Sequence, residues 1–339
     1  MTEPGQHMAR EIAEIPEVIA NQLKHNLDQY EALGRDWASN PPVFFATCAR
    51  GTSDQAALFF KYLTEIGTGI PVASLGPSLG AVFDGDLRMQ GAILLAISQS
   101  GASPDLLALT KKAALGGAQT VALLNTLPSP LSDIAGHTLP LSAGHERAVA
   151  ATKSFVASLV AVTAIHAGHT GDKSLLSALE AFPDALASIQ RVQTGNLRSL
   201  VDARRLFCLG RGVGLSVAGE AALKLKETCL LAAEGVSTAE FRHGPLALAD
   251  ERTAALVFLL DDATRPGTEA LIETLQQRGV RILTIGSGRT DFPIFGIPHP
   301  TVQAIAAIAV FYGLVQRLSL DLGLNPDAPP HLVKATLTE

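Results

Sequence analysis

Apolar residues in this chain occur in short uninterrupted runs that alternate with stretches of helical periodicity. Residues 42–67, 91–125, 204–227 and 254–286 each begin with such a run, followed by a polar or glycine-containing turn and a helical pattern. A strand that is apolar throughout is covered on both faces, and alternation with helices of about 12 residues is typical of a parallel sheet. The pattern therefore predicts βαβ units of an α/β protein.

The same order of elements occurs once in each half of the chain. The strand–turn–helix of residues 42–67 matches that of 204–227, and the strand–helix–strand of 91–125 matches that of 254–286. A repeat at half-chain scale indicates a duplicated fold. We expect two tandem domains with doubly wound parallel sheets, each a three-layer sandwich of the flavodoxin type.

The remaining segments are predicted to lead into and connect these domains. Apolar residues recur at helical spacing in residues 8–32, so residues 1–34 are expected to form a helical lead-in. Residues 35–169 would then be the first domain, 170–197 a helical connector, and 198–339 the second domain with its C-terminal tail.

Composition and charge narrow the class of protein. Hydrophobic residues make up 47% of the chain, charged residues 17%, and the net charge is −6, which fits a globular protein without a nucleic-acid surface. The apolar stretches 155–168 and 302–316 are shorter than the ~18 residues of a membrane span and are expected to be buried helices. Three scattered cysteines and the absence of an apolar signal core indicate a reduced, cytoplasmic protein.

Two turns in the first half are rich in small hydroxyl residues, "RGTSD" at 50–54 and "SQSGAS" at 98–103. Each precedes a predicted helix, whose N-terminal N–H groups and partial positive charge suit an anion. Gly51 and Gly101 permit close backbone approach, and the hydroxyls that add hydrogen-bond donors are those of Thr52, Ser53, Ser98, Ser100 and Ser103. We expect a phosphate monoester there. Ordinary helix N-capping favours the same residue types and is the alternative.

Other nucleotide and anion motifs are missing. No GxxxxGK[ST] pattern occurs, and "GRGVG" at 210–214 lacks the full dinucleotide fingerprint. In the second half, Asp261 and Asp262 follow the strand that corresponds to the one before Ser98. Two carboxylates would repel a dianion, so we expect a single phosphate site, in the first half.

Candidate acid–base groups lie in the second half. Lys224 and Glu227 are three residues apart and share a helix face, and His243 follows in an "HGP" loop. A carboxylate, an ammonium and an imidazole in one cleft can remove and return protons on a sugar. The alternative is that Glu220, Lys224 and Glu227 are surface ion pairs. His166 and His169 have no carboxylate or cysteine nearby and are expected to face solvent without binding a metal.

Several of these motifs together resemble one family. "ARGTSD", "SQSGASPD", "AVAATKS", "LGRG", "EAALKLKE", "EFRHGPLAL" and the tail "LVKATLTE" are similar to the sugar-isomerase (SIS) domain family in its double-domain form. The resemblance runs from about residue 10 to the end. It is nearest to the type-II glucosamine-6-phosphate deaminases and to the isomerase half of glutamine–fructose-6-phosphate amidotransferase.

The resemblance implies a role for individual residues. The sugar phosphate would be bound by Thr52, Ser53, Ser98, Gln99, Ser100 and Ser103, and the sugar lined by Val149 and Ala150. Glu227 would move a proton between C1 and C2, with Lys224 assisting at the sugar oxygens. His243 would assist ring opening, reaching into the partner's site of a homodimer. Lys334 would be the tail lysine near the open-chain carbonyl. No metal or other cofactor is implied.

The sequence departs from the amidotransferase pattern at several positions. That family usually has "SQSGET" and "ASTK", where this chain has Ala102-Ser103-Pro104 and Ala151, and Pro330-His331 stands in place of an Arg-Asn pair. No glutaminase segment precedes residue 10 in this sequence. These differences favour the deaminase branch, which converts glucosamine 6-phosphate into fructose 6-phosphate and ammonia. The alternatives are an aldose–ketose isomerase acting on another (amino)sugar phosphate and a non-catalytic sugar-phosphate sensor.

Overall fold

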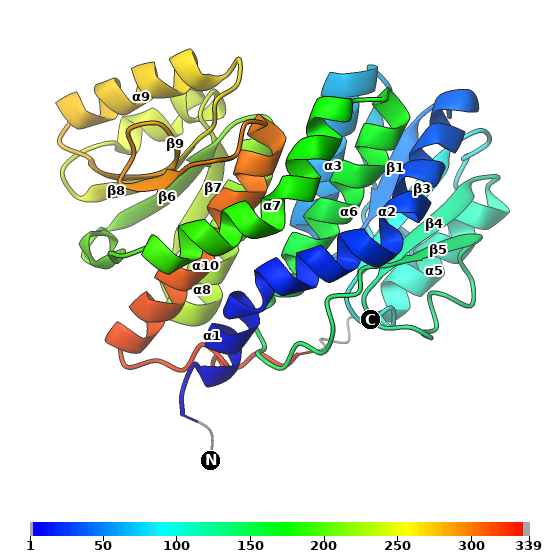
Figure 1. The fold of residues 1–339 in the computed structure, drawn as a ribbon, viewed down its shortest axis with the longest axis horizontal. Coiled ribbons are helices and arrows are strands. Elements are labelled where there is room, and N and C mark those ends of the chain that lie inside the picture. The colour runs from blue at the N-terminus through cyan, green and yellow to red at the C-terminus, as the bar shows by residue number, and fades with distance from the viewer. Residues whose placement is uncertain (1–2, 84, 335–339) are drawn as a thin grey trace. The chain divides into compact units, whose positions relative to one another are not determined.

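The computed structural model describes residues 3–83 and 85–334, and it contains two five-stranded sheets with helices packed on them (Figure 1). The first compact unit comprises residues 18–146 and 153–176. The second comprises the described residues up to 17, then 147–152 and 177–334. Every strand pairing in both sheets is parallel. The prediction of two doubly wound α/β sheets is confirmed.

The first sheet has the strand order β2-β1-β3-β4-β5. Its strands are β1 (Phe45–Cys48), β2 (Val72–Ser74), β3 (Ile93–Ser98), β4 (Gln119–Leu124) and β5 (His137–Pro140). The helices are α2 (Ile15–Ser39), α3 (Thr52–Thr68), α4 (Ser78–Ala81), α5 (Pro104–Leu115) and α6 (Lys153–Thr170). Successive residues of β1 point to opposite faces and contact different helices: Phe45 packs edge-on against Phe60 of α3, and Ala46 lies in a cluster with Leu109 of α5. Helices therefore cover both faces of the sheet.

The second sheet repeats this path, in the order β10-β9-β8-β6-β7. Its strands are β6 (Arg205–Gly210), β7 (Ala233–Ser237), β8 (Thr253–Leu259), β9 (Arg281–Ser287) and β10 (Phe292–Ile294). Helix α9 (Arg265–Gln277) packs Leu271 and Leu275 on Phe207 and Val257, while α8 (Val213–Cys229) packs against α10 (Pro300–Asp321). The unit also contains α1 (Gln6–Ala13) and most of α7 (Lys173–Val192).

The duplication extends to the backbone of equivalent turns. Gly51 precedes α3 with φ 54° and ψ −126°, and Gly212 precedes α8 with φ 56° and ψ −131°. A side chain at this combination of angles is strained, so glycine is needed at both places. Each glycine lies in the short turn after the strand at which the sheet order reverses, β1 in one sheet and β6 in the other.

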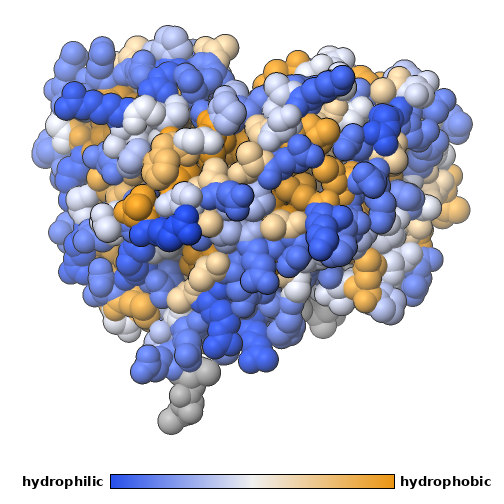
Figure 2. All heavy atoms as spheres, viewed as in Figure 1, coloured by the Kyte–Doolittle hydropathy of each residue, from blue (hydrophilic) through white to orange (hydrophobic). Residues whose placement is uncertain are grey.

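The long apolar stretches are buried helices, as predicted. Almost every side chain of α6 up to Ala167 and of α10 up to Ser319 is buried. Among the described residues, α10 alone is long and apolar enough to cross a membrane by length and composition, and most of it is buried inside the protein, as a core helix is. On the face shown in Figure 2, hydrophilic side chains are interspersed with smaller apolar groups.

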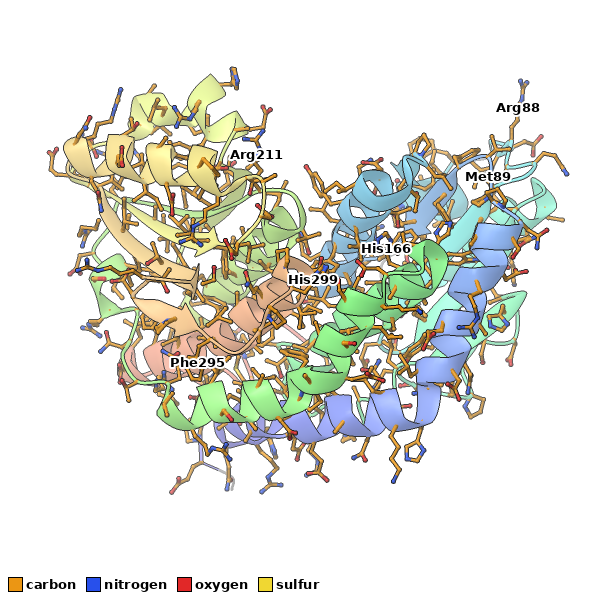
Figure 3. All side chains as sticks on the ribbon, turned by 45° about the horizontal axis from the view of Figure 1, so that its top comes forward. Arg88, Met89, His166, Arg211, Phe295 and His299 are labelled. Carbon is orange, nitrogen blue, oxygen red and sulfur yellow. The ribbon has the colours of Figure 1, made fainter. Side chains whose placement is uncertain are left out.

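The expectation that His166 and His169 face solvent is wrong for His166. Its side chain is 6% exposed within α6 (Figure 3) and lies against Gly67 of α3, where an added Cβ would be 2.4 Å from the imidazole Cε1. His169 is half-buried against Trp37 and Phe45, with ring centroids 6.2 and 6.1 Å apart, and burial lowers its pKa. Helix α6 continues to Thr170 within the first unit, so both imidazoles pack on other elements.

Two glycines let α2 and α6 touch through their backbones. A Cβ on Gly34 would lie 2.1 Å from the carbonyl oxygen of Ile165, and one on Gly168 would lie 2.5 Å from that of Glu31. Backbone atoms cannot rotate away from such a contact as a side chain can, so any larger residue must push the helices apart.

We predict that Gly34→Ala destabilises the protein. Alanine is favoured over glycine in a helix by about 1 kcal/mol, but forcing a methyl group into a packed backbone contact costs about 1–3 kcal/mol or more, so the clash should dominate. Urea unfolding measures the difference. Gly85→Ala is the control, since nothing lies within 4 Å of its added Cβ. Equal or greater stability of Gly34→Ala would contradict the helix contact.

Candidate functional site

The hydroxyl-rich turns lie where the order of the first sheet reverses. "RGTSD" follows β1 and "SQSGAS" follows β3, and these strands are hydrogen-bonded neighbours whose helices start at Thr52 and Pro104. In open parallel sheets, ligands bind at this switch point, beyond the carboxyl ends of the strands. The two loops that the sequence singled out are thus side by side at the place where such a fold binds ligands.

The hydroxyls do not cap the helices that follow them. In the described structure, neither α3 nor α5 has a side-chain cap hydrogen bond at its start. Ser98 Oγ, 6% exposed, instead accepts from the amide of Gly101 at 3.0 Å, and Ser100 Oγ accepts from that of Ala102 at 3.3 Å. These bonds shape the second loop from within. The N-capping alternative therefore does not account for the hydroxyls.

An ion pair ties the two loops together. Arg50, directly before Gly51, donates from Nε and Nη2 to Oδ2 of Asp105 at 2.8 and 2.7 Å. Asp105 is 1% exposed, in the first turn of α5, whereas the guanidinium of Arg50 is half-exposed. Arg50 is the first residue of the "RGTSD" loop, and the two hydroxyl loops contain no other arginine and no lysine.

The corresponding turn of the second sheet has different chemistry. After β8, Asp262 Oδ1 accepts from both the amide and the hydroxyl of Thr264, at 2.7 and 2.6 Å, and Asp261 is exposed. Arg211 lies in the turn before α8 (Figure 3). The registers of the two sheets match Ser98 with Leu259, so Asp261 and Asp262 stand at the positions of Ser100 and Gly101, two residues beyond the Ser98 and Gln99 that the sequence pattern suggested.

A buried charge cluster lies on α8 in the second unit. Lys224 and Glu220 have fully buried side chains, and the Lys224 ammonium lies 2.5 Å from Glu227 Oε2 and 3.2 Å from Glu220 Oε1. Tyr312 of α10 donates its hydroxyl proton to Glu220 Oε1 at 2.9 Å. Glu227 is the one carboxylate of the pair that reaches solvent, at 21% exposure. The surface ion-pair alternative is therefore wrong for Glu220 and Lys224.

The burial of these groups changes how they bind protons. The pKa of Glu220 is raised to about 7, mainly by burial and also by Glu227, although Lys224 and Tyr312 act to lower it. Burial alone would lower the pKa of Lys224, but the two carboxylates more than offset this and the pKa is raised. Lys224 thus stays an ammonium, and Glu220 is the group of the cluster that titrates near neutrality.

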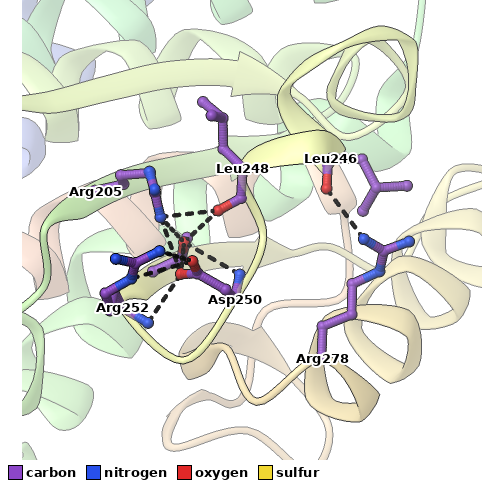
Figure 4. A network of polar contacts seen from close by, with 7 residues as sticks. Arg205, Leu246, Leu248, Asp250, Arg252 and Arg278 are labelled. Atoms are coloured by element: carbon purple, nitrogen blue, oxygen red, sulfur yellow. Dashed lines mark hydrogen bonds and ion pairs between the residues drawn. The ribbon is translucent and has the colours of Figure 1, made fainter.

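Two arginines hold the segment after His243 by donating hydrogen bonds to its backbone carbonyls. His243 ends a short 3₁₀ helix (Glu240–His243) and is exposed; a second one follows (Pro245–Leu248). Arg278 donates to the carbonyl of Leu246 at 3.3 Å, and Arg205 donates to that of Leu248 at 3.2 Å (Figure 4).

The same network contains Asp250. Its carboxylate accepts from Arg205 and Arg252, and hydrogen bonding to Arg252 holds its pKa well below the usual range. The network therefore fixes the end of the segment that leads into β8, while the imidazole of His243 remains exposed to solvent.

The last candidate residues lie together in the second unit. Lys334 donates from Nζ to the carbonyl of Ala148 at 2.6 Å, and the amide of Val149 donates to the carbonyl of Asp327 at 3.0 Å. The C-terminal tail thus contacts the segment that contains Val149 and Ala150. A cavity of about 750 Å³ lies elsewhere, beside α2 and at Gln119 and His137, where β4 and β5 begin, away from the carboxyl ends of those strands.

Two parallel sheets of one topology, with polar groups at the strand ends, define a tandem doubly wound α/β protein. The chain belongs to the SIS domain family, whose model matches residues 45–167 and 199–291. The first matched segment contains the whole first sheet, and the second contains the second sheet except its edge strand β10.

Known proteins resemble most of the chain. The glutamine–fructose-6-phosphate aminotransferase (isomerizing) of Thermococcus kodakarensis is 30% identical over 98% of this chain, which spans 58% of that protein. A Silicibacter pomeroyi structure assigned as a phosphosugar isomerase has a TM-score of 0.87 and 38% identity over 95% of this chain and 99% of its own. The Thermotoga maritima glucosamine-6-phosphate deaminase, with a TM-score of 0.79 and 20% identity, covers 98% of this chain and 100% of its own, and shares the fold.

Sequence reasoning missed three features of these arrangements. Glu220 was considered only as a surface residue, although its spacing of four from Lys224 places the two on one helix face. Tyr312 lies in an apolar stretch 92 residues further on, and nothing in its local pattern indicates a carboxylate partner. The Arg50–Asp105 pair joins residues 55 apart, which only the parallel pairing of β1 and β3 brings together.

We predict that Glu220 makes stability depend on pH. Its pKa is raised from 4.5 to about 7 on folding, so between these values the folded state binds more protons than the unfolded one and stability falls as pH rises. At 1.36 kcal/mol per pH unit, the contribution is roughly 3 kcal/mol. Urea unfolding of wild type and Glu220→Gln from pH 4.5 to 8 isolates it: the wild type should lose stability relative to the variant up to about pH 7. Parallel curves would contradict the raised pKa.

Proposed function

We propose that this protein is a glucosamine-6-phosphate deaminase that converts glucosamine 6-phosphate and water into fructose 6-phosphate and ammonia. The observation that carries the proposal is the pairing of Lys224 with the partly exposed Glu227, at 2.5 Å, in a chain of the SIS family. A carboxylate oriented by a buried ammonium is suited to moving a proton between adjacent carbons. The aminotransferase and isomerase names of its relatives support chemistry on a sugar phosphate.

The phosphate would be bound at the hydroxyl loops of the first sheet. The free N–H groups at the starts of α3 and α5 and the hydroxyls of Ser53 and Ser103 are suitable donors, and among the described residues these two hydroxyls have no hydrogen-bond partner. Thr52, Ser98, Gln99 and Ser100 complete the proposed set. Backbone amides, hydroxyls and the half-exposed Arg50 favour a dianion there, whereas Asp261 and Asp262 disfavour one in the second sheet.

The proposed chemistry needs only proton transfers and water. His243 promotes ring opening, which gives an aldehyde at C1 and leaves the amine on C2. Glu227 removes the proton from C2, the electron pair of the C2–H bond forms the C1–C2 double bond of an enolamine, and the carbonyl pair moves to O1, which takes up a proton. Glu227 then returns a proton to C1. The resulting C2 iminium adds water, and the C2–N bond breaks to release ammonia. The C1 carbonyl makes the C2 proton acidic, and Lys224 assists at the sugar oxygens.

Two further parts of the proposal concern the tail and the assembly. Lys334 has an amine that can form an imine with an open-chain carbonyl. Val149 and Ala150, which follow the residue whose carbonyl binds Lys334, would line the sugar. We also propose a homodimer in which the exposed His243 reaches the partner's site, and a cytoplasmic location, in line with three free, buried cysteines.

We predict that Glu227→Gln lowers kcat for ammonia release from glucosamine 6-phosphate by about 10²–10⁴-fold, the usual contribution of one acid–base group. The amide keeps the size of the side chain but cannot accept the C2 proton. Glu273→Gln on α9 is the matched control, because Glu273 is exposed, and it should retain wild-type turnover. A near-normal rate in Glu227→Gln would remove Glu227 from this role.

The same assay separates the deaminase from its alternatives. Ammonia and fructose 6-phosphate are measured over a panel of amino-sugar and neutral-sugar phosphates. Aldose–ketose conversion without ammonia on any amino sugar would identify an isomerase, which the isomerase relative favours as the second candidate. Binding of a sugar phosphate without any turnover would identify a sensor.

We predict that the double variant Ser53→Ala/Ser103→Ala raises KM for the sugar phosphate and leaves kcat nearly unchanged. A hydrogen bond to a charged group is worth about 1.5–3 kcal/mol, so each lost bond should weaken binding by at least tenfold. Ser39→Ala, at the exposed end of α2, is the control. An unchanged KM would place the phosphate elsewhere.

A further inference from the structure

The segment at residues 147–149 is held by the two ends of the chain. The carboxylate of Glu11 on α1 accepts hydrogen bonds from the backbone amides of Arg147 and Ala148. The carbonyl of Ala148 accepts from Lys334 Nζ at 2.6 Å, and the amide of Val149 donates to the carbonyl of Asp327 at 3.0 Å. All six residues belong to the second compact unit.

The two ends of the chain are also bound to each other. The carboxylate of Asp327 accepts from the amides of His7 and Met8 at 3.0 and 2.8 Å, at the start of α1. Asn325 Oδ1 accepts from the amide of Gly5 at 3.1 Å. No side chain of α1 itself caps this end, so the tail supplies acceptors for the free N–H groups of the helix. A carboxylate at a helix N-terminus is also favoured by the helix dipole.

Glu11 is a buried carboxylate, and its burial costs free energy unless strong hydrogen-bond partners compensate for the lost hydration. Its side chain is 4% exposed. Ala148 supplies part of that compensation. Its amide binds an anion from one end of the chain and its carbonyl binds an ammonium from the other, and both bonds are charge-assisted. Removal of either partner leaves a buried backbone group without its bond.

We propose that Glu11 and Asp327 are positioning residues: through the backbone of residues 147–149 they set the place of Lys334 relative to Val149 and Ala150. This rests on the proposed function, in which Lys334 meets the open-chain carbonyl and Val149 and Ala150 line the sugar. Helix α1 then helps to position the site residues, although Glu11 touches no reacting atom. A near-attack geometry is sensitive to displacements of about 1 Å, so a loosened segment reduces the rate of the step at the carbonyl.

The first test needs no substrate. Hydrogen exchange of the backbone amides is compared in wild type, Glu11→Gln, Glu11→Ala and the control Glu17→Ala, whose side chain is exposed at the start of α2. We expect the amides of Arg147 and Ala148 to exchange about tenfold to a hundredfold faster in Glu11→Ala, as for loss of a charge-assisted bond. Glu11→Gln keeps one acceptor oxygen and should lie between. Exchange at these amides equal to that of Glu17→Ala overturns the proposal.

The second test measures turnover for each folded enzyme. With the sugar phosphate that the wild type converts, Glu11→Ala and Asp327→Asn should lower kcat about tenfold or more while KM for the phosphate-bearing substrate changes less. A residue that acts only on global stability would reduce the folded fraction and leave both constants of the folded enzyme unchanged, and that result overturns the proposal. If Glu11→Ala does not fold, Glu11→Gln and Asp327→Asn decide in both tests.

The outcomes separate this proposal from the proposed function. Lack of ammonia release by the wild type overturns the deaminase assignment, while the hydrogen-exchange test still decides whether Glu11 holds residues 147–149. Normal ammonia release with unchanged exchange and turnover in the Glu11 and Asp327 variants leaves the deaminase in place and removes the two positioning residues.

Discussion

Burial of both faces of each parallel sheet is the constraint on which the rest of the structure depends. Strands such as β3 and β8 are buried along their whole length, so neither face can offer a polar group to a ligand. Chemistry is confined to the strand ends and to the helices that follow, where the backbone still has free N–H groups. Short turns lead from β1 and β6 into those helices, and the last residue of each turn, Gly51 or Gly212, has nearly the same backbone conformation in both units.

Within this shared frame, charge distinguishes the two units. The hydroxyl loops of the first unit carry few ionisable groups, and the ion pair of Arg50 with Asp105 joins them. The second unit holds a fully buried ammonium between two carboxylates. Two carboxylates and one ammonium leave an excess negative charge, and burial makes the charge on the fully enclosed Glu220 costly. A proton on Glu220 relieves that cost near neutral pH, and Lys224 remains available to orient the more exposed Glu227.

The features that could be predicted from the sequence are those that depend on the local pattern of apolar and polar residues. Apolar runs and helical periodicity gave the duplicated α/β fold and the buried helices α6 and α10, because each run must be covered on every side. The edge strands β2, β5, β7 and β10 were not anticipated, since β2 and β10 have only three residues and β5 and β7 are partly exposed. His166 was expected to face solvent because it lies close to the predicted connector and has no carboxylate or cysteine nearby in the sequence, whereas in space it packs against Gly67 of α3.

The contacts that the sequence could not provide are those between distant segments. Glu11 and Arg147 are 136 residues apart, and Lys334 and Ala148 are 186 apart, yet each pair forms a hydrogen bond that fixes the same short segment. No periodicity records such a pairing, because the partners are backbone groups and any residue type supplies them. The motif "AVAATKS" therefore identifies the segment, while its position in space depends on carboxylates and an amine contributed by the two ends of the chain. For this reason substitutions in α1, which carries no recognised motif, are expected to affect the chemistry as strongly as substitutions beside the motif itself.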